Sequence, residues 1–413
     1  MLKLVSLLGL CGFLAVAWGL SNNRKRFPWR TVLSGLGLQF LFGLLILKTD
    51  VGKSVFGAAR TAAEKLIEVS VDGAAFVFGP LANEDLLADK LGPEHSFIFV
   101  VVVTATIIVV SSLSAALYHY GILQKVVQAF AWVMQRAMHT TGSESLAAAA
   151  NIFMGQTEAP LVVKPYLPHM TPSELMALMT GGMATIAGGV MAAYVSFGID
   201  AGHLLTASVM SAPAALLVAK IMIPETEKSE TASGAKAEIE IESTNGLDAL
   251  CRGASQGALL AINVMAMLIA FVAIVALVNY LISAPQTALG VADPVTLERL
   301  FGWLNAPFAF LMGVPRGDCV AVGEALGERI VLNEFIGYLT LAGIQETVDE
   351  RSYRLATYAL CGFANFSSIA IQIGGIGSLA PDRRKDLARL GGRAMIGGVL
   401  ASYLTAAMVG ILT

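Results

Sequence analysis

The sequence predicts an all-α polytopic membrane protein, in which eight transmembrane helices accompany two re-entrant hairpins in inverted repeats and several interfacial helices. The first observation is composition: 56% of the 413 residues are hydrophobic and only 14% are charged, whereas soluble domains average about 25% charged residues. The mean hydropathy is +0.70. The second observation is the length of the apolar runs. The third is that two carboxylates, Glu158 and Glu334, interrupt otherwise apolar segments.

Eight stretches are apolar over a length that suits a bilayer crossing, which takes about 20 helical residues. The first could instead be a cleaved signal peptide. However, its positive cluster RKR (24–26) follows the apolar run rather than preceding it, so we expect a retained span. The predicted spans are 4–20, 31–47, 97–118, 175–198, 201–219, 258–283, 355–378 and 394–412.

Charge and polarity organise the segments between the spans. Lysine and arginine concentrate in the loops RKRFPWR (24–30) and PDRRKDLAR (381–389), which eight crossings place on one side. Because positive loops stay in the cytoplasm, we expect a multi-pass protein of the cytoplasmic (inner) membrane with both chain ends outside. Residues 224–246 are polar and acidic, and are typical of a solvated linker. Mixed apolar and charged faces predict interfacial helices at 52–68, 122–137 and 298–312.

Two further apolar segments are too short or too interrupted to cross the membrane, at 145–163 and 330–345. Irregular backbone at membrane depth is tolerated only where protein buries it or where it lines a cavity. We therefore predict re-entrant hairpins. Each precedes a span with a small, polar break, ATIAGG (184–189) or ANFSS (364–368). Three spans separate the hairpins, so the second unit is inverted relative to the first, as in secondary transporters.

These features predict a division of the chain into scaffold and transport units. The expected parts are a scaffold of spans one to three with an interfacial helix (1–118), a first transport repeat (119–222), a polar cytoplasmic linker (223–257), scaffold span six (258–292) and a second transport repeat (293–413).

The polar side chains near the breaks indicate what such a site can bind. An acidic residue at the bilayer centre costs roughly 2.5–3.5 kcal/mol, so Glu158 and Glu334 are functional candidates. The alternative is a structural ion pair, for which Arg329 is five residues from Glu334. The surrounding amides and hydroxyls suit a neutral, hydroxyl-rich solute. Asn151, Thr185 and backbone carbonyls would suit a hard monovalent cation such as sodium.

Other classes of protein lack support in the sequence. No basic patch points to nucleic acid. The four cysteines and five histidines have no ligand spacing, so neither a disulfide framework nor a metal-dependent enzyme is indicated. No cofactor motif and no nucleophile elbow appears. A channel with a carboxylate selectivity ring and an intramembrane enzyme stay as alternatives from other classes, although neither a pore-like charge ring nor a nucleophile–base pair is present.

Four segments together resemble a known family. GQTEAPLVVKPYL (155–167), MATIAGGVMAAY (183–194), VLNEFIGYL (331–339) and CGFANFSSIAIQIGGIGSLAP (361–381) are similar to signature segments of the concentrative nucleoside transporters. The resemblance runs in order from the third span to the C-terminus. It implies a homotrimer in the lipid bilayer that imports nucleosides such as uridine, with eight spans, two opposed hairpins and no enzymatic activity.

The resemblance also implies roles for individual residues. The first hairpin would address the nucleobase and the second would bind the ribose. The implied nucleoside site consists of Gln156, Thr157, Glu158, Val190, Glu334, Phe363, Asn365 and Ser368. The implied sodium site consists of Asn151, Met154, Thr185 and Ile186. Proton-coupled relatives depart from the GQTEAP pattern, which this chain keeps, so sodium coupling is favoured and a proton-coupled nucleoside symporter is the alternative.

Overall fold

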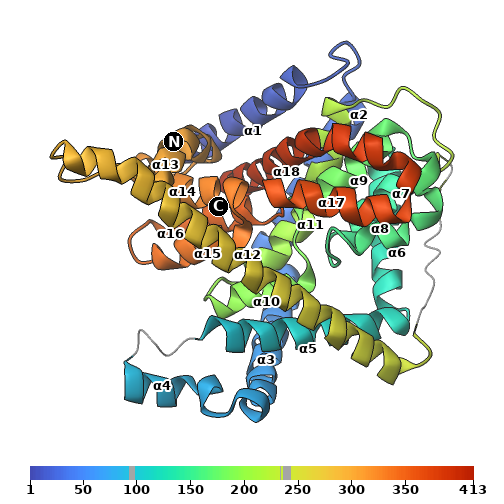
Figure 1. The fold of residues 1–413 in the computed structure, drawn as a ribbon. Helices are drawn as coiled ribbons and strands as arrows, with labels where there is room; N and C mark the ends of the chain where they lie inside the picture. Colours follow the sequence, from blue (N-terminus) through green and yellow to red (C-terminus); the bar gives the residue numbers. More distant parts are fainter. Residues whose placement is uncertain (93–97, 233, 236–242) are drawn as a thin grey trace.

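The computed structural model describes residues 1–92, 98–232, 234–235 and 243–413, and all regular secondary structure in these ranges is helical (Figure 1). Residue 97 of the third predicted span, His95, and residues 233 and 236–242 of the predicted linker lie outside the described part of the chain. The helices are α1 (Leu2–Gly19), α2 (Trp29–Lys48), α3 (Asp50–Phe78), η1 (Gly79–Ala82), α4 (Glu84–Leu91), α5 (Phe99–His119), α6 (Ile122–Met138), α7 (Gly142–Ala150), α8 (Ala159–Val162), η3 (Lys164–His169), α9 (Pro172–Ala184), α10 (Gly188–Ser196), α11 (Ala201–Met222), α12 (Gly246–Ala288), α13 (Leu297–Met312), η4 (Arg316–Asp318), α14 (Cys319–Val331), α15 (Glu334–Gly343), α16 (Glu350–Leu360), α17 (Phe366–Leu379), η5 (Pro381–Arg383) and α18 (Arg384–Leu412).

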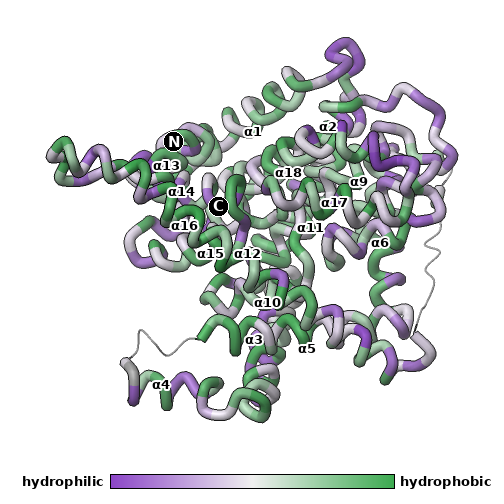
Figure 2. The backbone as a smooth tube through the Cα atoms, in the orientation of Figure 1, coloured by the Kyte–Doolittle hydropathy of each residue, from purple (hydrophilic) through white to green (hydrophobic). Residues whose placement is uncertain are grey.

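Eight helical segments are long and apolar enough to cross a membrane by length and composition. Figure 2 shows hydrophobic colour along much of the long helices and hydrophilic colour gathered at connections and helix ends. The number agrees with the prediction, but the set differs. The eight segments are Leu2–Gly19, Trp29–Lys48, Asp50–Lys90, Phe99–His119, Pro172–Ser196, Ala201–Met222, Gly246–Ala288 and Pro381–Leu412.

Two predicted elements have different bounds. The interfacial helix expected at 52–68 is part of α3, which is 29 residues long and ends where Gly79 adopts a φ of +57°. The span expected at 355–378 is two helices, α16 and α17, separated by residues 361–365. The other two predicted interfacial helices correspond to α6 and α13.

The polar linker is shorter than expected, because α12 begins at Gly246 and runs for 43 residues. Asn245 caps the first turn by accepting a hydrogen bond from the Asp248 N–H. Small residues then let the helix lie close against α5: a Cβ added to Gly253 would come 2.6 Å from the Ser111 carbonyl oxygen, and one on Gly257 would come 2.9 Å from the Ile108 Cα. This packing makes a helix of residues 246–257, which the predicted division of the chain places in the linker.

The core of the protein is formed by α9, α11 and α18. About 94% of the apolar window of α11 is buried and 83% of that of α18, against 17% for α12. α1 and α2 pack against α18 and α11, which belong to the predicted transport repeats, whereas α5 packs chiefly on α12. The division of the chain into scaffold and transport units stays a prediction.

Both predicted hairpins are helix–break–helix units. The first has α7 and α8 as its arms around residues 151–158, close to the predicted 145–163. The second has α14 and α15 around Leu332 and Asn333. It begins at Cys319, so the predicted segment 330–345 contained its tip and second arm only. The re-entrant course of both units stays a prediction.

Candidate functional site

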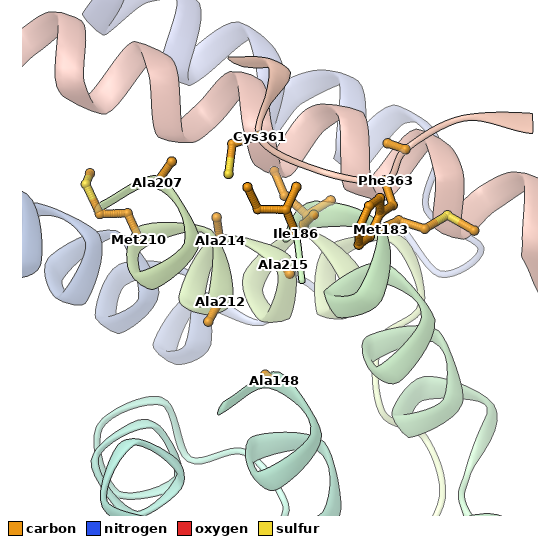
Figure 3. Packing of buried hydrophobic residues seen from close by; sticks show 14 of the residues in the cluster. Ala148, Met183, Ile186, Ala207, Met210, Ala212, Ala214, Ala215, Cys361 and Phe363 are labelled. Atoms are coloured by element: carbon orange, nitrogen blue, oxygen red, sulfur yellow. The ribbon is translucent and has the colours of Figure 1, made fainter. Parts of the chain in front are cut away.

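Two interrupted helices meet at their breaks. α9 and α10 are separated by residues 185–187, and α16 and α17 by residues 361–365. The Phe363 N–H donates a hydrogen bond to the Thr185 carbonyl (3.3 Å), which joins one break to the other. Figure 3 shows Cys361 and Phe363 of the second break over Ile186 of the first. Backbone groups freed by both interruptions are thus concentrated in one buried region.

Gly362 makes this close contact possible. Its φ is +156°, and a Cβ at this position would lie 2.7 Å from the carbonyl oxygen of Met183. A side chain of any size would therefore push the two breaks apart.

We expect Gly362→Ala to lower the free energy of unfolding by about 1–3 kcal/mol, the usual cost of backbone strain or overpacking. The midpoint of thermal unfolding of the purified protein in detergent checks this. Gly374→Ala in α17 is the control, because a Cβ there meets nothing within 4 Å. An unchanged midpoint for Gly362→Ala would contradict the close approach of the two breaks.

The first hairpin reaches the same region. Its irregular segment, residues 151–158, follows α7, and the Phe153 carbonyl accepts a hydrogen bond from the Gly188 N–H at the start of α10 (3.2 Å). A Cβ on Gly182 would lie 3.0 Å from the Cβ of Gln156, so the segment also packs closely on α9. The polar residues of the first hairpin are therefore held against the break between α9 and α10.

Glu334 lies at the tip of the second hairpin, as the first residue of α15, and it is 3% exposed. Its two carboxylate oxygens have separate donors. The Tyr194 hydroxyl donates to Oε1 (3.0 Å), and the Asn365 amide donates to Oε2 (2.9 Å). Asn365 is also the N-cap of α17, where its Oδ1 accepts from the Ser368 N–H (2.9 Å). The carboxylate is thus buried with its hydrogen bonds satisfied, as a buried charge requires.

Gln156 continues this network from the first hairpin. Its Nε2 donates to the Ser368 hydroxyl (2.9 Å), and its Oε1 accepts from the Gln372 amide (3.1 Å). Since Ser368 bonds to Asn365, the network is continuous from Gln372 to Glu334. Four of the predicted nucleoside-site residues are therefore brought together: Gln156 and Glu334 from the two hairpins, and Asn365 and Ser368 from the start of α17.

Thr157 and Glu158 are exposed, and within the described chain no hydrogen bond joins either side chain to that network. Glu158 lines a cavity of about 820 Å³ between the first hairpin and the pair α5–α12. Met154 and Phe153 line the same cavity, while Glu334 is not among the described residues that do. The structure does not join the two predicted carboxylates in one cavity. The remaining candidates, Val190 on α10 and Phe363 in the second break, are buried in the hydrophobic core beside these elements.

The predicted cation site is at the junction of α7 and α9. Asn151 is 1% exposed, and its Nδ2 donates to the Ala147 carbonyl (3.0 Å). Within the described part of the chain, its Oδ1 has no hydrogen-bond partner. The Thr185 hydroxyl bonds to the Gly181 carbonyl (2.9 Å), and a Cβ on Gly181 would lie 3.1 Å from Asn151 Nδ2. Asn151 and Thr185 therefore flank Gly181, and the unpaired amide oxygen fits a hard cation. The other two predicted ligands, Met154 and Ile186, are buried beside these residues.

Sequence reasoning missed Tyr194 and Gln372. Gln372 is a polar residue one helical turn after Ser368, a spacing that places both on one face of α17. Tyr194 is likewise one turn after Val190 on α10. Sequence reasoning also left open an ion pair between Arg329 and Glu334. These two side chains are not among the ion pairs of the described chain, because no Glu334 oxygen lies within 4 Å of an Arg329 nitrogen.

Interrupted helices that meet at a buried polar network, within a bundle of apolar spans, define a secondary transporter. Three family models match the chain: the Na+-dependent nucleoside transporter N-terminus at residues 8–81, nucleoside recognition at 100–201, and the Na+-dependent nucleoside transporter C-terminus at 203–410. The chain belongs to this family, the concentrative nucleoside transporters, and is a multi-pass membrane transporter rather than an enzyme.

Relatives and solved structures agree with this assignment. An uncharacterized transporter of Haemophilus influenzae is 45% identical, over 99% of this chain and 97% of its own length. Solute carrier family 28 member 3 of Mus musculus is 40% identical over all of this chain but 59% of its own length. The structure of CNTnw in an inward-facing substrate-bound state has a TM-score of 0.93, with 38% identity and coverage of 100% of this chain and 98% of that one. A CNTnw variant in an outward-facing state has a TM-score of 0.94, 38% identity and the same coverage. Nucleoside transport by alternating access is therefore the activity of this family.

Proposed function

We propose that this protein is a sodium-coupled symporter that imports nucleosides such as uridine across the cytoplasmic membrane. The observation that carries the proposal is the buried network from Gln372 through Gln156, Ser368 and Asn365 to Glu334, next to an unpaired Asn151 oxygen. It contains amides, hydroxyls and one carboxylate, and no lysine or arginine of the described chain takes part in its hydrogen bonds. Such groups favour a neutral solute with many hydroxyls over an anion.

Glu334, Asn365 and Ser368 would bind the ribose. A ribose hydroxyl can donate to the Glu334 carboxylate and accept from the Asn365 amide. The nucleoside therefore replaces the Asn365–Glu334 hydrogen bond with two of its own, and no polar group is left unpaired. Tyr194 holds the other carboxylate oxygen meanwhile. The ribose site would thus be preformed, because hydrogen bonds among its own polar side chains already hold them in place.

Gln156, Thr157 and Glu158 would address the base, with Val190 and Phe363 as its apolar neighbours. Gln156 is already in the network, whereas Glu158 faces the 820 Å³ cavity beside α5 and α12. For all three residues to bind the base, the exposed side chains of Thr157 and Glu158 must turn toward the Gln156 side chain. This movement is consistent with transport that carries the hairpin units, elevator-like, past α5 and α12.

Sodium coupling is supported by the residues at the α7–α9 junction. Asn151 Oδ1 is a buried acceptor without a donor among the described residues, which a bound cation would satisfy, and Thr185 adds a hydroxyl. The carbonyls of Met154 and Ile186 would complete an oxygen-only ligand set. One sodium ion entering down about 100 mV gains ~2.3 kcal/mol, and a tenfold gradient adds ~1.4 kcal/mol. Together these support roughly 500-fold accumulation of a neutral solute.

The test is uptake of labelled uridine into proteoliposomes under imposed ion gradients. We expect an inward sodium gradient to drive accumulation above the outside concentration, and a proton gradient without sodium to leave uptake at background. Uptake that follows protons and ignores sodium would favour the proton-coupled alternative, and equilibration without accumulation would indicate a channel. We also propose that the protein is a homotrimer, as the family resemblance implies. Its molar mass in detergent, measured by size-exclusion chromatography with light scattering, tests this.

A further inference from the structure

Arg329 is a buried cation that the proposed site does not use. It lies in the last turn of α14, in the second hairpin, and is 0% exposed. Its Nη1 donates to the carbonyl of Ala359, while Nε and Nη2 have no hydrogen-bond partner within the described chain. Its guanidinium lies 5.5 Å from the ring centroid of Tyr403. A buried guanidinium without a bonded carboxylate is costly, so its position calls for an explanation.

The carbonyl that Arg329 contacts belongs to the broken end of α16. This helix stops at Leu360, and its last-turn carbonyls have no partners inside the helix. Arg329 binds the carbonyl of Ala359, and the Tyr338 hydroxyl of the same hairpin binds that of Thr357 (2.9 Å). The second hairpin therefore caps the C-terminal end of α16 with one charged and one neutral donor.

The two charges of the second hairpin match the two ends of the break. The C-terminus of α16 carries the negative end of a helix dipole, and the N-terminus of α17 carries the positive end of another. Arg329 is at the first, and Glu334 is joined to the second through the cap residue Asn365. Each buried charge thus faces a helix end of opposite sign.

The first break has a corresponding helix end, with an uncharged cap. There α9 ends at Ala184 with Thr185 as its C-cap, and the first hairpin supplies Asn151, an amide whose oxygen has no partner within the described chain. This is where the proposed sodium ion would bind. In the second repeat, the hairpin supplies a guanidinium to the end of α16 instead. In the first repeat the proposed sodium ion would lie at the end of α9, whereas in the second repeat the Arg329 side chain lies at the end of α16.

We propose that Arg329 is a built-in cation, a positioning residue that neutralises the broken end of α16 and holds the second hairpin so that Glu334 faces the nucleoside. The inference rests on the proposed function for its substrate and coupling ion. It has two consequences. Nucleoside binding depends on a positive charge at position 329, and the second repeat takes up no sodium ion of its own.

The first consequence is tested on purified full-length protein by calorimetric titration with uridine in saturating sodium, without any gradient. Arg329→Met removes the charge and keeps a long side chain, and we expect the Kd for uridine to rise at least about tenfold, as for a lost charge-assisted contact. Arg329→Lys keeps the charge, and Tyr338→Phe removes the neutral cap of the same helix end. Both are expected to stay within about threefold of wild type.

Several results would overturn the proposal. Equal losses in Arg329→Lys and Arg329→Met would show that shape rather than charge matters. An equal loss in Tyr338→Phe would show that a neutral hydrogen bond to this helix end matters as much as the charge, and would also overturn the proposal. If Arg329→Met does not fold, judged by its thermal midpoint, Arg329→Lys decides: wild-type affinity supports the charge role and a large loss refutes it.

The second consequence is tested on wild-type proteoliposomes. The reversal potential of uridine flux gives the number of sodium ions moved with each nucleoside. A ratio of one supports the built-in cation, and a ratio of two overturns it. If flux instead follows protons, the proposed sodium coupling fails, but the binding comparison of the Arg329 variants still stands, because it needs no gradient.

Discussion

Uridine uptake is expected to fall by about a hundredfold or more in Glu334→Gln, with the protein still folded. Glutamine has the same shape, but it loses the charge on the atoms that receive the Tyr194 hydroxyl and the Asn365 amide. A hydrogen bond to a charged group contributes about 1.5–3 kcal/mol, and the ribose would make more than one. The measurement is initial uptake of labelled uridine into proteoliposomes driven by a sodium gradient.

Two companion variants make this result interpretable. Glu68→Gln changes an exposed carboxylate that pairs with Lys65 on α3, and we expect wild-type uptake. Glu158→Gln tests the other proposed carboxylate, which lies in the cavity rather than in the network, and we expect uptake to be abolished there too. Retained uptake in both Glu158→Gln and Glu334→Gln would remove the basis for the proposed nucleoside site.

The second large effect is expected in Asn151→Leu. Leucine has the same branched arrangement of heavy atoms as asparagine but lacks the Oδ1 that has no partner within the described chain, so the proposed cation loses a ligand that water cannot easily replace in a buried position. We expect the half-saturating sodium concentration for uridine uptake to rise at least about tenfold, the cost of one lost interaction of about 1.4 kcal/mol. Uptake is measured over a series of sodium concentrations with choline as the replacement ion.

Matched threonine variants control for packing in this region. Thr185→Val removes the second proposed ligand and is expected to act in the same direction. Thr180→Val removes a buried hydroxyl on α9, the helix that ends just before Thr185. This hydroxyl has no hydrogen-bond partner in the described chain and lies against Gly397 of α18, so the sodium dependence should be unchanged. An Asn151→Leu protein with wild-type sodium dependence would place the cation elsewhere.

The positions of the breaks show how far local sequence reaches. ATIAGG (184–189) predicted an interruption, and α9 and α10 are separated at 185–187. ANFSS (364–368) also predicted one, but the break lies at 361–365, because Asn365 caps α17 and Ser367 and Ser368 are already helical. Small residues and cap residues act within one turn, so a sequence marks a break to within a few residues.

Helix ends that depend on distant contacts were placed less well. α12 extends twelve residues into the segment predicted as linker, since glycines such as Gly253 let it pack on α5. α1 and α2 pack on α11 and α18, and no pattern along the chain indicates these partners. Neither result follows from hydropathy, which reports how apolar a segment is and not which neighbour covers it.

The sequence by itself determined that the chain spans a membrane, where its apolar segments lie, and that Glu158 and Glu334 need a functional reason to be there. These are properties of short segments, since the cost of moving residues from water into lipid depends on the residues themselves. The tertiary structure alone decided which polar groups meet. Gln156 and Ser368 are 212 positions apart and 2.9 Å from each other, and Arg329 turns to the end of α16 rather than to Glu334. Such contacts depend on how whole helices pack, because only packing fixes the distance between residues far apart in the chain.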